Sequence, residues 1–191
     1  VGSLGGVWAV FRKTVDDHIV MGDEYAVEKK WHLAASEYGK AVNKDDSPGA
    51  DLLVKLYDAR SQIKVPYGAE ARTAYSRLHA LIERATREDP SNADAFSRLM
   101  RIYMTLGVHL DHLAVWAEMG NAASHTLEVS PTMREAGKYR GIAQVNRLRR
   151  GLNLNDEERA RAKIDLDTYR ALHPDDSECT YHLAIWYVEE S

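Results

Sequence analysis

The sequence has little of what marks several classes of protein. A single cysteine, Cys179, among 191 residues excludes an internal disulfide framework and a cysteine-rich zinc module. With only 12 glycines and 5 prolines, the chain is neither collagen-like nor of low complexity. No apolar run reaches the roughly 18 residues that a complete transmembrane helix needs. The formal net charge of −4 also disfavours a globally basic nucleic-acid-binding protein.

What is present is an ordinary globular composition. Hydrophobic residues make up 45% of the chain and charged residues 28%, a mixture that can bury a core and is not typical of disorder. A length of 191 residues fits one domain or one continuous array of repeats. We therefore expect a single folded core or a single array.

The start of the chain differs from the rest. Val1 to Phe11 carry no charge, and Arg12 and Lys13 follow at once. This stretch is too short to span a bilayer. It fits either the end of a membrane helix, with a tether upstream of residue 1, or a first apolar helix that docks on the fold. Of the two interpretations, we favour the docking helix.

Both ends of the sequence suggest a part of a longer protein. The chain begins with Val1, and its last helix-like stretch reaches Ser191 without a capping residue. The expected organisation is an apolar segment at residues 1–14 and a helical array at residues 15–191, truncated at the C-terminus. Such a protein would be cytoplasmic, or a membrane-tethered soluble domain.

Apolar residues recur at intervals of three and four along most of the chain. One such face holds Trp31, Ala34, Tyr38 and Ala41, which is the periodicity of a helix and not the alternation of a strand. The sequence therefore predicts helices throughout, arranged in pairs. The windows are separated by turn-forming clusters near residues 43–49, 89–92, 130–132, 151–156 and 173–177.

The spacing around the turn prolines repeats. Two prolines are each followed by a leucine nine residues later and by a tyrosine thirteen residues later. Near the start of the chain, a small residue and a tyrosine have the same internal spacing, and a small-x3-aromatic pair follows. The repeated positions are Gly22, Tyr25, Ala34, Tyr38, Ala41, Pro90, Leu99, Tyr103, Pro174, Leu183, Ala184 and Tyr187. The expected buried positions among them are Tyr25, Tyr38, Leu99, Tyr103, Leu183 and Tyr187, with Gly22 and Ala184 at close helix crossings.

This pattern resembles the tetratricopeptide repeat (TPR), with its W-x2-L-G-x2-Y, A-x3-F and P positions. The resemblance implies an all-α, right-handed superhelical array of antiparallel helix pairs, a TPR-like α-solenoid. We expect irregular repeat lengths, because Pro90, Pro131 and Pro174 are separated by 41 and 43 residues where the standard repeat has about 34. Asn146 also stands where the pattern has tyrosine. About four helix pairs and a final half-pair are expected.

No catalytic or metal-binding set emerges from the residues. There is no G-x-S-x-G, phosphate-binding glycine loop or H-E-x-x-H. His109 and His112, with Asp111 between them and His125 further on, are residue types that bind zinc, but we expect surface or helix-capping histidines. Cys179 is expected to be a packed or idle thiol in the last helix. We therefore expect no enzyme activity, no cofactor and no metal.

Charge is distributed unevenly. Residues 134–163 contain nine basic and four acidic residues, whereas residues 164–191 contain one basic and seven acidic residues. The densest basic spot contains Arg147, Arg149 and Arg150, which either belong to a solvated helix end or form a binding patch. We take these three arginines as the candidate partner-binding residues.

The family resemblance implies a scaffold that binds a peptide or partner protein in the superhelical groove and performs no chemistry. Electrostatics would direct an acidic segment to the three arginines, or a basic one to Asp175, Asp176 and Glu178. The alternative is a helical regulatory module that contacts RNA or another polyanion through residues 147–150. Nucleic acid is the less expected partner because the chain is acidic.

The repeat alignment makes a prediction about stability. Leu99→Ala should lower the free energy of unfolding by about 2–5 kcal/mol, because the alignment places Leu99 in the core. Urea unfolding followed by circular dichroism measures the change. A loss below about 0.5 kcal/mol, typical of a surface position, would show that the repeats are aligned wrongly.

Overall fold

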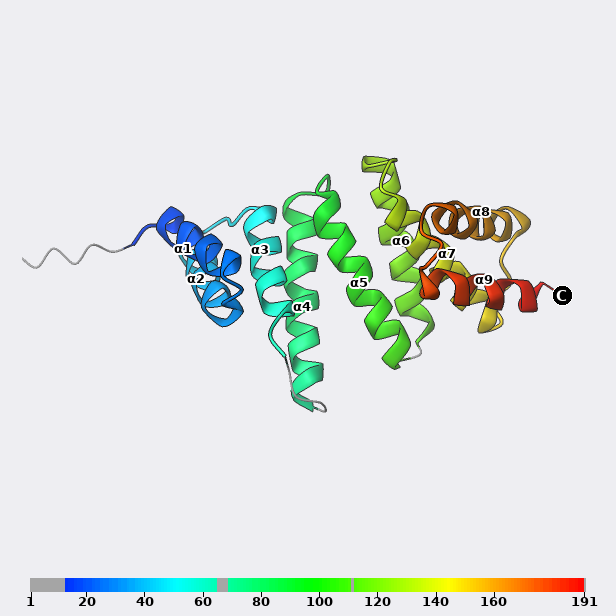
Figure 1. Ribbon diagram of the computed structural model, residues 1–191, viewed down its shortest axis with the longest axis horizontal. Coiled ribbons are helices and arrows are strands. Elements are labelled where there is room, and N and C mark those ends of the chain that lie inside the picture. Colours follow the sequence, from blue (N-terminus) through cyan, green and yellow to red (C-terminus); the bar gives the residue numbers. More distant parts are fainter. Residues whose placement is uncertain (1–12, 65–68, 111, 191) are drawn as a thin grey trace, which may run out of the picture. The chain divides into compact units, whose positions relative to one another are not determined.

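The computed structural model describes residues 13–64, 69–110 and 112–190, and it is all-helical over this part of the chain, without a strand. This confirms the predicted all-α class, and the nine helices described match the expected four pairs and a half-pair (Figure 1). None of the described helices is long and apolar enough to cross a membrane. Most of the expected N-terminal segment, residues 1–12, lies outside the described residues. The helices are α1 (Val15–Val27), α2 (Trp31–Lys44), α3 (Ala50–Ser61), α4 (Ala69–Glu88), α5 (Ala93–Leu110), α6 (Leu113–Val129), α7 (Arg134–Arg149), α8 (Asp156–Leu172) and α9 (Ser177–Glu189).

The chain divides into two compact units. The N-terminal unit contains α1, α2 and residues 55–64. The C-terminal unit contains residues 49–54 and α4 to α9. The division falls within α3, and each unit is described separately below.

In the N-terminal unit, α1 and α2 pack closely because α1 carries a glycine at the crossing. A Cβ atom on Gly22 would lie 2.6 Å from Cδ1 of Tyr38 on α2, so any larger residue would collide with the ring. The ring is held in place, since Tyr38 is buried and its hydroxyl donates a hydrogen bond of 2.7 Å to Asp23. Lys55 pairs with the same carboxylate at 2.7 Å, which ties residues 55–64 to α1.

Polar contacts fix the start of α1 and its contact with α2. Thr14 accepts a hydrogen bond from the backbone N–H of Asp17, whose carboxylate in turn accepts one from the backbone N–H of Thr14. This reciprocal cap satisfies backbone donors that have no partner within the helix. Inside the unit, the buried His18 and Glu37 side chains meet at 2.7 Å.

In the C-terminal unit, successive helices pack as neighbours from α4 to α9, and α7 also contacts α5 and α9. Figure 1 shows α7, α8 and α9 side by side at the C-terminal end of the chain. Two further glycines allow close crossings here. A Cβ atom on Gly107 of α5 would lie 2.6 Å from the Trp116 ring of α6, and one on Gly141 of α7 would lie 2.7 Å from Leu166 of α8. The largest fully buried side chains of this unit include Ile82, Met100, Trp116, Met119, Ile142, Leu166 and Leu183.

The positions of the repeat pattern are buried in most helices but not in α9. Ala34, Tyr38, Ala41, Leu99, Tyr103 and Leu183 are all buried, and Tyr25 is partly exposed. Two expectations are wrong: Tyr187, expected to be buried, is 52% exposed, and Ala184, expected at a close helix crossing, is exposed as well. The reason is that α9 packs on α7 and α8 through the side that carries Cys179, His182 and Leu183. Ala184 points away from that side, and Tyr187 lies at its edge near the end of the helix, with its ring centre 5.6 Å from the Lys163 ammonium group. Pro90 and Pro174 lie in the turns before α5 and α9.

The crossing of α1 and α2 generates a second prediction. Gly22→Ala should destabilise the protein by about 1–3 kcal/mol, because the new methyl group forces the buried Tyr38 ring out of place. Thermal unfolding measures the effect.

Gly39→Ala is the matched control on α2. Its added Cβ atom would meet only the end of the Arg60 side chain, at 3.9 Å. Because alanine favours a helix more than glycine does, this change should be neutral or stabilising by up to about 1 kcal/mol. Equal destabilisation by the two substitutions would contradict the close crossing.

Candidate functional site

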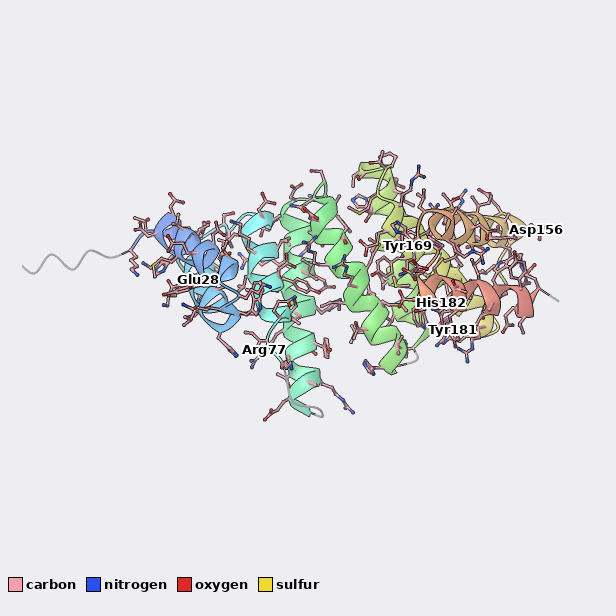
Figure 2. The ribbon with its side chains drawn as sticks, viewed as in Figure 1. Glu28, Arg77, Asp156, Tyr169, Tyr181 and His182 are labelled. Atoms are coloured by element: carbon pink, nitrogen blue, oxygen red, sulfur yellow. The ribbon has the colours of Figure 1, made fainter. Side chains whose placement is uncertain are left out.

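A pocket with a volume of about 530 Å³ opens in the C-terminal unit, lined by residues of α5, α6, α7 and α9. Its apolar lining comes from Met104 and Val108 of α5, Trp116 of α6 and Tyr181 of α9. Val108 is 63% exposed and Tyr181 56% exposed, so two large apolar side chains face solvent at this pocket. Figure 2 shows Tyr181 next to His182 on α9. The size is typical of cavities that bind small molecules or a few side chains, which are about 300–1,000 Å³.

One wall of the pocket is built on Trp116. The indole is 1% exposed and lies against α5 at Gly107, where any side chain would collide with it. The guanidinium group of Arg150, just after α7, lies over the same ring at 5.3 Å from its centroid. Arg150 also donates hydrogen bonds to the backbone oxygen and Oδ1 of Asn146, at 2.8 and 3.0 Å. Burial lowers the pKa of Arg150. Trp116 and Asn146 thus fix an arginine in the pocket wall.

His182 forms a buried polar part of the lining. It is 5% exposed, and its Nδ1 lies 3.5 Å from the Nδ2 amide nitrogen of Asn146. Since Asn146 Nδ2 also donates to the Ile142 carbonyl and Oδ1 accepts from Arg150, the amide orientation is set by its partners. Nδ1 therefore faces a donor, and the imidazole proton belongs on Nε2. Burial, together with the charges of Lys138 and Arg149, lowers the pKa of His182 to about 4, so the ring is neutral near pH 7.

The structure separates the three candidate arginines. Arg149 and Arg150 both line the pocket. Arg149 is exposed and has no ion pair within the described part of the chain. Arg147 instead points to α8, where its guanidinium group lies 3.7 Å from the carboxylate of Glu158. The three arginines therefore do not form one patch.

Two of the three acidic residues expected to attract a basic partner, Asp176 and Glu178, are engaged in the fold, whereas Asp175 is exposed. The buried Lys138 ammonium group lies 2.8 Å from Asp176 and 2.7 Å from Glu178, and 5.2 Å from the centre of the Tyr169 ring. Burial acts to lower the pKa of Lys138, but the hydrogen bonds to the two carboxylates raise it overall. Asp176 also caps α9 by accepting a hydrogen bond from the backbone N–H of Cys179, at 2.8 Å. This Lys138 cluster attaches α9, and with it Tyr181 and His182, to α7.

Other ion pairs join the basic stretch, residues 134–163, to the acidic stretch, residues 164–191. The basic stretch and the acidic stretch that follows it meet within α7, α8 and α9, so much of their opposite charge is neutralised inside the C-terminal unit. The pairs are Arg140 with Asp165 at 2.7 Å, Arg159 with Glu190 at 2.6 Å and Lys163 with Asp167 at 2.6 Å.

The histidines that resemble zinc ligands have other contacts. His112 caps α6, since its Nδ1 accepts a hydrogen bond from the backbone N–H of Ala114. His125 donates through Nε2 to the carbonyl of Pro90 at 2.8 Å. Asp111 lies outside the described residues. Over residues 13–64, 69–110 and 112–190, no group of three His, Cys, Asp or Glu side chains is arranged to hold a metal ion.

The Lys138 cluster generates a third prediction. Lys138→Met should lower the free energy of unfolding by about 1–3 kcal/mol, because the charge-assisted hydrogen bonds from Lys138 to the partly exposed Asp176 and Glu178 are lost. Since hydrogen bonds from Lys138 and from the Cys179 backbone lower the pKa of Asp176 against the effect of burial, the wild-type advantage is present above about pH 4. It should shrink as the pH falls through the lowered pKa. Urea unfolding of both proteins at several pH values measures this.

Arg161→Met is the control for that experiment. It breaks an exposed pair with Glu157 one turn away on α8, so the loss should stay below about 0.5 kcal/mol. A loss for Lys138→Met as small as the control's would refute the structural role of the cluster.

The sequence matches no family model and no curated protein sequence. Several solved structures are nevertheless similar over most of the chain. YrrB, a TPR protein with an unusual peptide-binding site, is 15% identical with a TM-score of 0.61, over 87% of this chain and 73% of YrrB. The MamA protein is 12% identical with a TM-score of 0.65, over 92% of this chain and 82% of MamA.

A third structure agrees with these two. TTC0263, a thermophilic TPR protein in Thermus thermophilus, is 11% identical with a TM-score of 0.58, over 92% of this chain and 82% of TTC0263. At such low identities the likeness concerns the fold. Together with the repeated helix pairs, it confirms the resemblance that the sequence pattern indicated: the chain has the fold of the tetratricopeptide-repeat proteins, a TPR-like α-solenoid.

Proposed function

We propose that this protein is an interaction scaffold that binds a peptide segment of a partner protein, performs no chemistry, and uses the pocket between α5, α6, α7 and α9 for binding. The observation that carries the proposal is the pocket itself, which combines exposed apolar side chains with two arginines, the exposed Arg149 and the fixed Arg150. The similar fold of YrrB, a TPR protein with a peptide-binding site, supports the same class of function.

Stacked helices suit this task. Each helix of the unit contacts its neighbours along the chain, so the side chains that line the pocket are held on a preformed surface. A preformed surface loses little conformational entropy when a ligand binds. Val108 and Tyr181 supply apolar area that a bound segment would cover, and Arg149 supplies charge for steering and specificity.

The polar groups of the pocket suit recognition better than catalysis. His182 directs Nδ1 to Asn146, and Glu178 is paired with Lys138. The Cys179 thiol is buried and donates to the carbonyl of Leu166, and burial raises its pKa. A reactive thiol needs the opposite, a lowered pKa and access to substrate. The alternative of a polyanion patch loses one of its arginines, because Arg147 is paired with Glu158.

A selection from a random-peptide phage library tests the proposal, with the full chain immobilised. We expect enriched peptides whose affinity falls about fivefold or more in Val108→Gln, because the substitution removes apolar area worth about 1 kcal/mol from the pocket. Fluorescence anisotropy of the synthetic peptides measures the affinity.

Ile164→Gln is the matched control. Ile164 lies on α8, does not line the pocket and is 63% exposed, the same fraction as Val108. It should leave the affinity unchanged. The proposal is wrong if no peptide is enriched, or if both substitutions act equally. Binding of RNA with a steep dependence on salt, in place of peptides, would favour the polyanion alternative.

A further inference from the structure

We propose that the pocket recognises one carboxylate side chain within a peptide segment, flanked on both sides by large apolar side chains. This inference rests on the proposed function, and it adds the chemistry of the ligand. It is carried by three independent features of the pocket: its charge, the hydrogen-bond donor of His182, and the order of the helices around it.

The charges that line the pocket are complementary to a single negative charge on a ligand. Arg149 and Arg150 line the pocket, and Glu178 is the acidic residue of the lining. Glu178 is already paired with Lys138, which also pairs with Asp176. Arg149 has no ion pair within the described residues, so it leaves one positive charge at the pocket, which matches a single carboxylate. A phosphorylated side chain, with about −1.5 to −2 charges at pH 7, would exceed it.

His182 provides a directed donor for that carboxylate. Its Nδ1 faces the amide nitrogen of Asn146, which places the proton on Nε2. Nε2 has no hydrogen-bond partner among the described residues, although the side chain is 95% buried and lines the pocket. Because His182 lines the pocket, this N–H is available to an acceptor on a bound ligand. The exposed Arg149 guanidinium group offers further donors of the fork geometry that suits carboxylates.

The order of the helices places large apolar side chains on both sides of the polar residues that α7 contributes to the pocket. α7 carries Asn146 and Arg149 and contacts both α5 and α9. The large apolar residues of the lining are Met104 and Val108 on α5 and Tyr181 on α9. A segment with its acidic residue over α7 would therefore place the preceding and following side chains on these two walls. A carboxylate at a chain terminus has a neighbour on one side only, so an internal acidic residue fits better.

The experiment begins with the peptides that the phage selection enriches on the wild-type chain. We expect a consensus in which Asp or Glu stands between large apolar residues. The consensus peptide is then synthesised with acetylated and amidated ends, which removes the terminal charges. Replacing its acidic residue by the matching amide should weaken binding at least tenfold to wild-type protein. In Arg149→Gln the same replacement should change the affinity less than twofold.

Three controls make the result specific. Arg134→Gln removes an exposed arginine from the first turn of the same helix and should retain the full tenfold effect. His182→Phe removes the donor and keeps the ring, and should weaken the acidic peptide several-fold more than its amide form, with circular dichroism as a check of folding. A phosphoserine peptide and one with a free terminal carboxylate as its only acid should bind more weakly than the consensus peptide.

The outcomes separate this inference from the proposed function. Enriched peptides that lack an acidic residue, or that respond to the amide replacement equally in wild type and Arg149→Gln, overturn the carboxylate inference. If those peptides still weaken in Val108→Gln, the proposed function stands. Stronger binding of the phosphoserine or free-carboxylate peptide overturns the choice of an internal carboxylate. The absence of any enriched peptide rejects the proposed function, and the inference with it.

Discussion

The structure depends on the close approach of helices that a glycine on one helix allows to a large side chain on the next. Within the described residues this contact occurs three times: at Gly22 and Tyr38, at Gly107 and Trp116, and at Gly141 and Leu166. The distance between packed helices is set by the side chains at the crossing, so each glycine fixes how near its helix comes. The rest follows from these contacts. Gly107 leaves room for the Trp116 ring, and the Arg150 guanidinium group packs over that ring. Arg150 in turn donates to the Asn146 amide, which lies against His182.

Electrostatics has a second and different role, because most charges near the pocket attach helices to one another. Lys138 ties α7 to the start of α9, and Arg140 ties α7 to α8. Arg149 is an exception, since it lines the pocket and has no ion pair within the described residues. A net charge distribution read from the sequence overstates what a partner encounters, because opposite charges that neutralise each other in the fold still count in the sum.

Periodicity predicted the helices and their pairing, and the repeated spacing identified Tyr38, Leu99, Tyr103 and Leu183 as buried. The repeated spacing gave the wrong result for Ala184 and Tyr187. Apolar residues at intervals of three and four positions indicate an apolar helix face, but they do not show that another helix covers that face. The spacing of the arginines along α7 already showed that they could not form one patch. At about 100° per residue, Arg147 and Arg149 lie on opposite sides of α7, whereas Asn146, Arg149 and Arg150 share one side. Trp116 and His182 come from other helices, so their meeting with α7 depends on tertiary packing that local spacing does not encode.

The single cysteine has a consequence for observing how the last helix moves. Its sulfur lies in the contact between α9 and α8, fully shielded from solvent and bonded to the carbonyl of Leu166. A thiol reagent can therefore react with Cys179 only after these two helices separate. Because the sequence contains no second thiol, the labelling rate of the unmodified protein reports the opening of this one contact. The same helix carries Tyr181 and His182, so slower labelling in the presence of a ligand would reveal occupancy of the pocket without any engineered reporter.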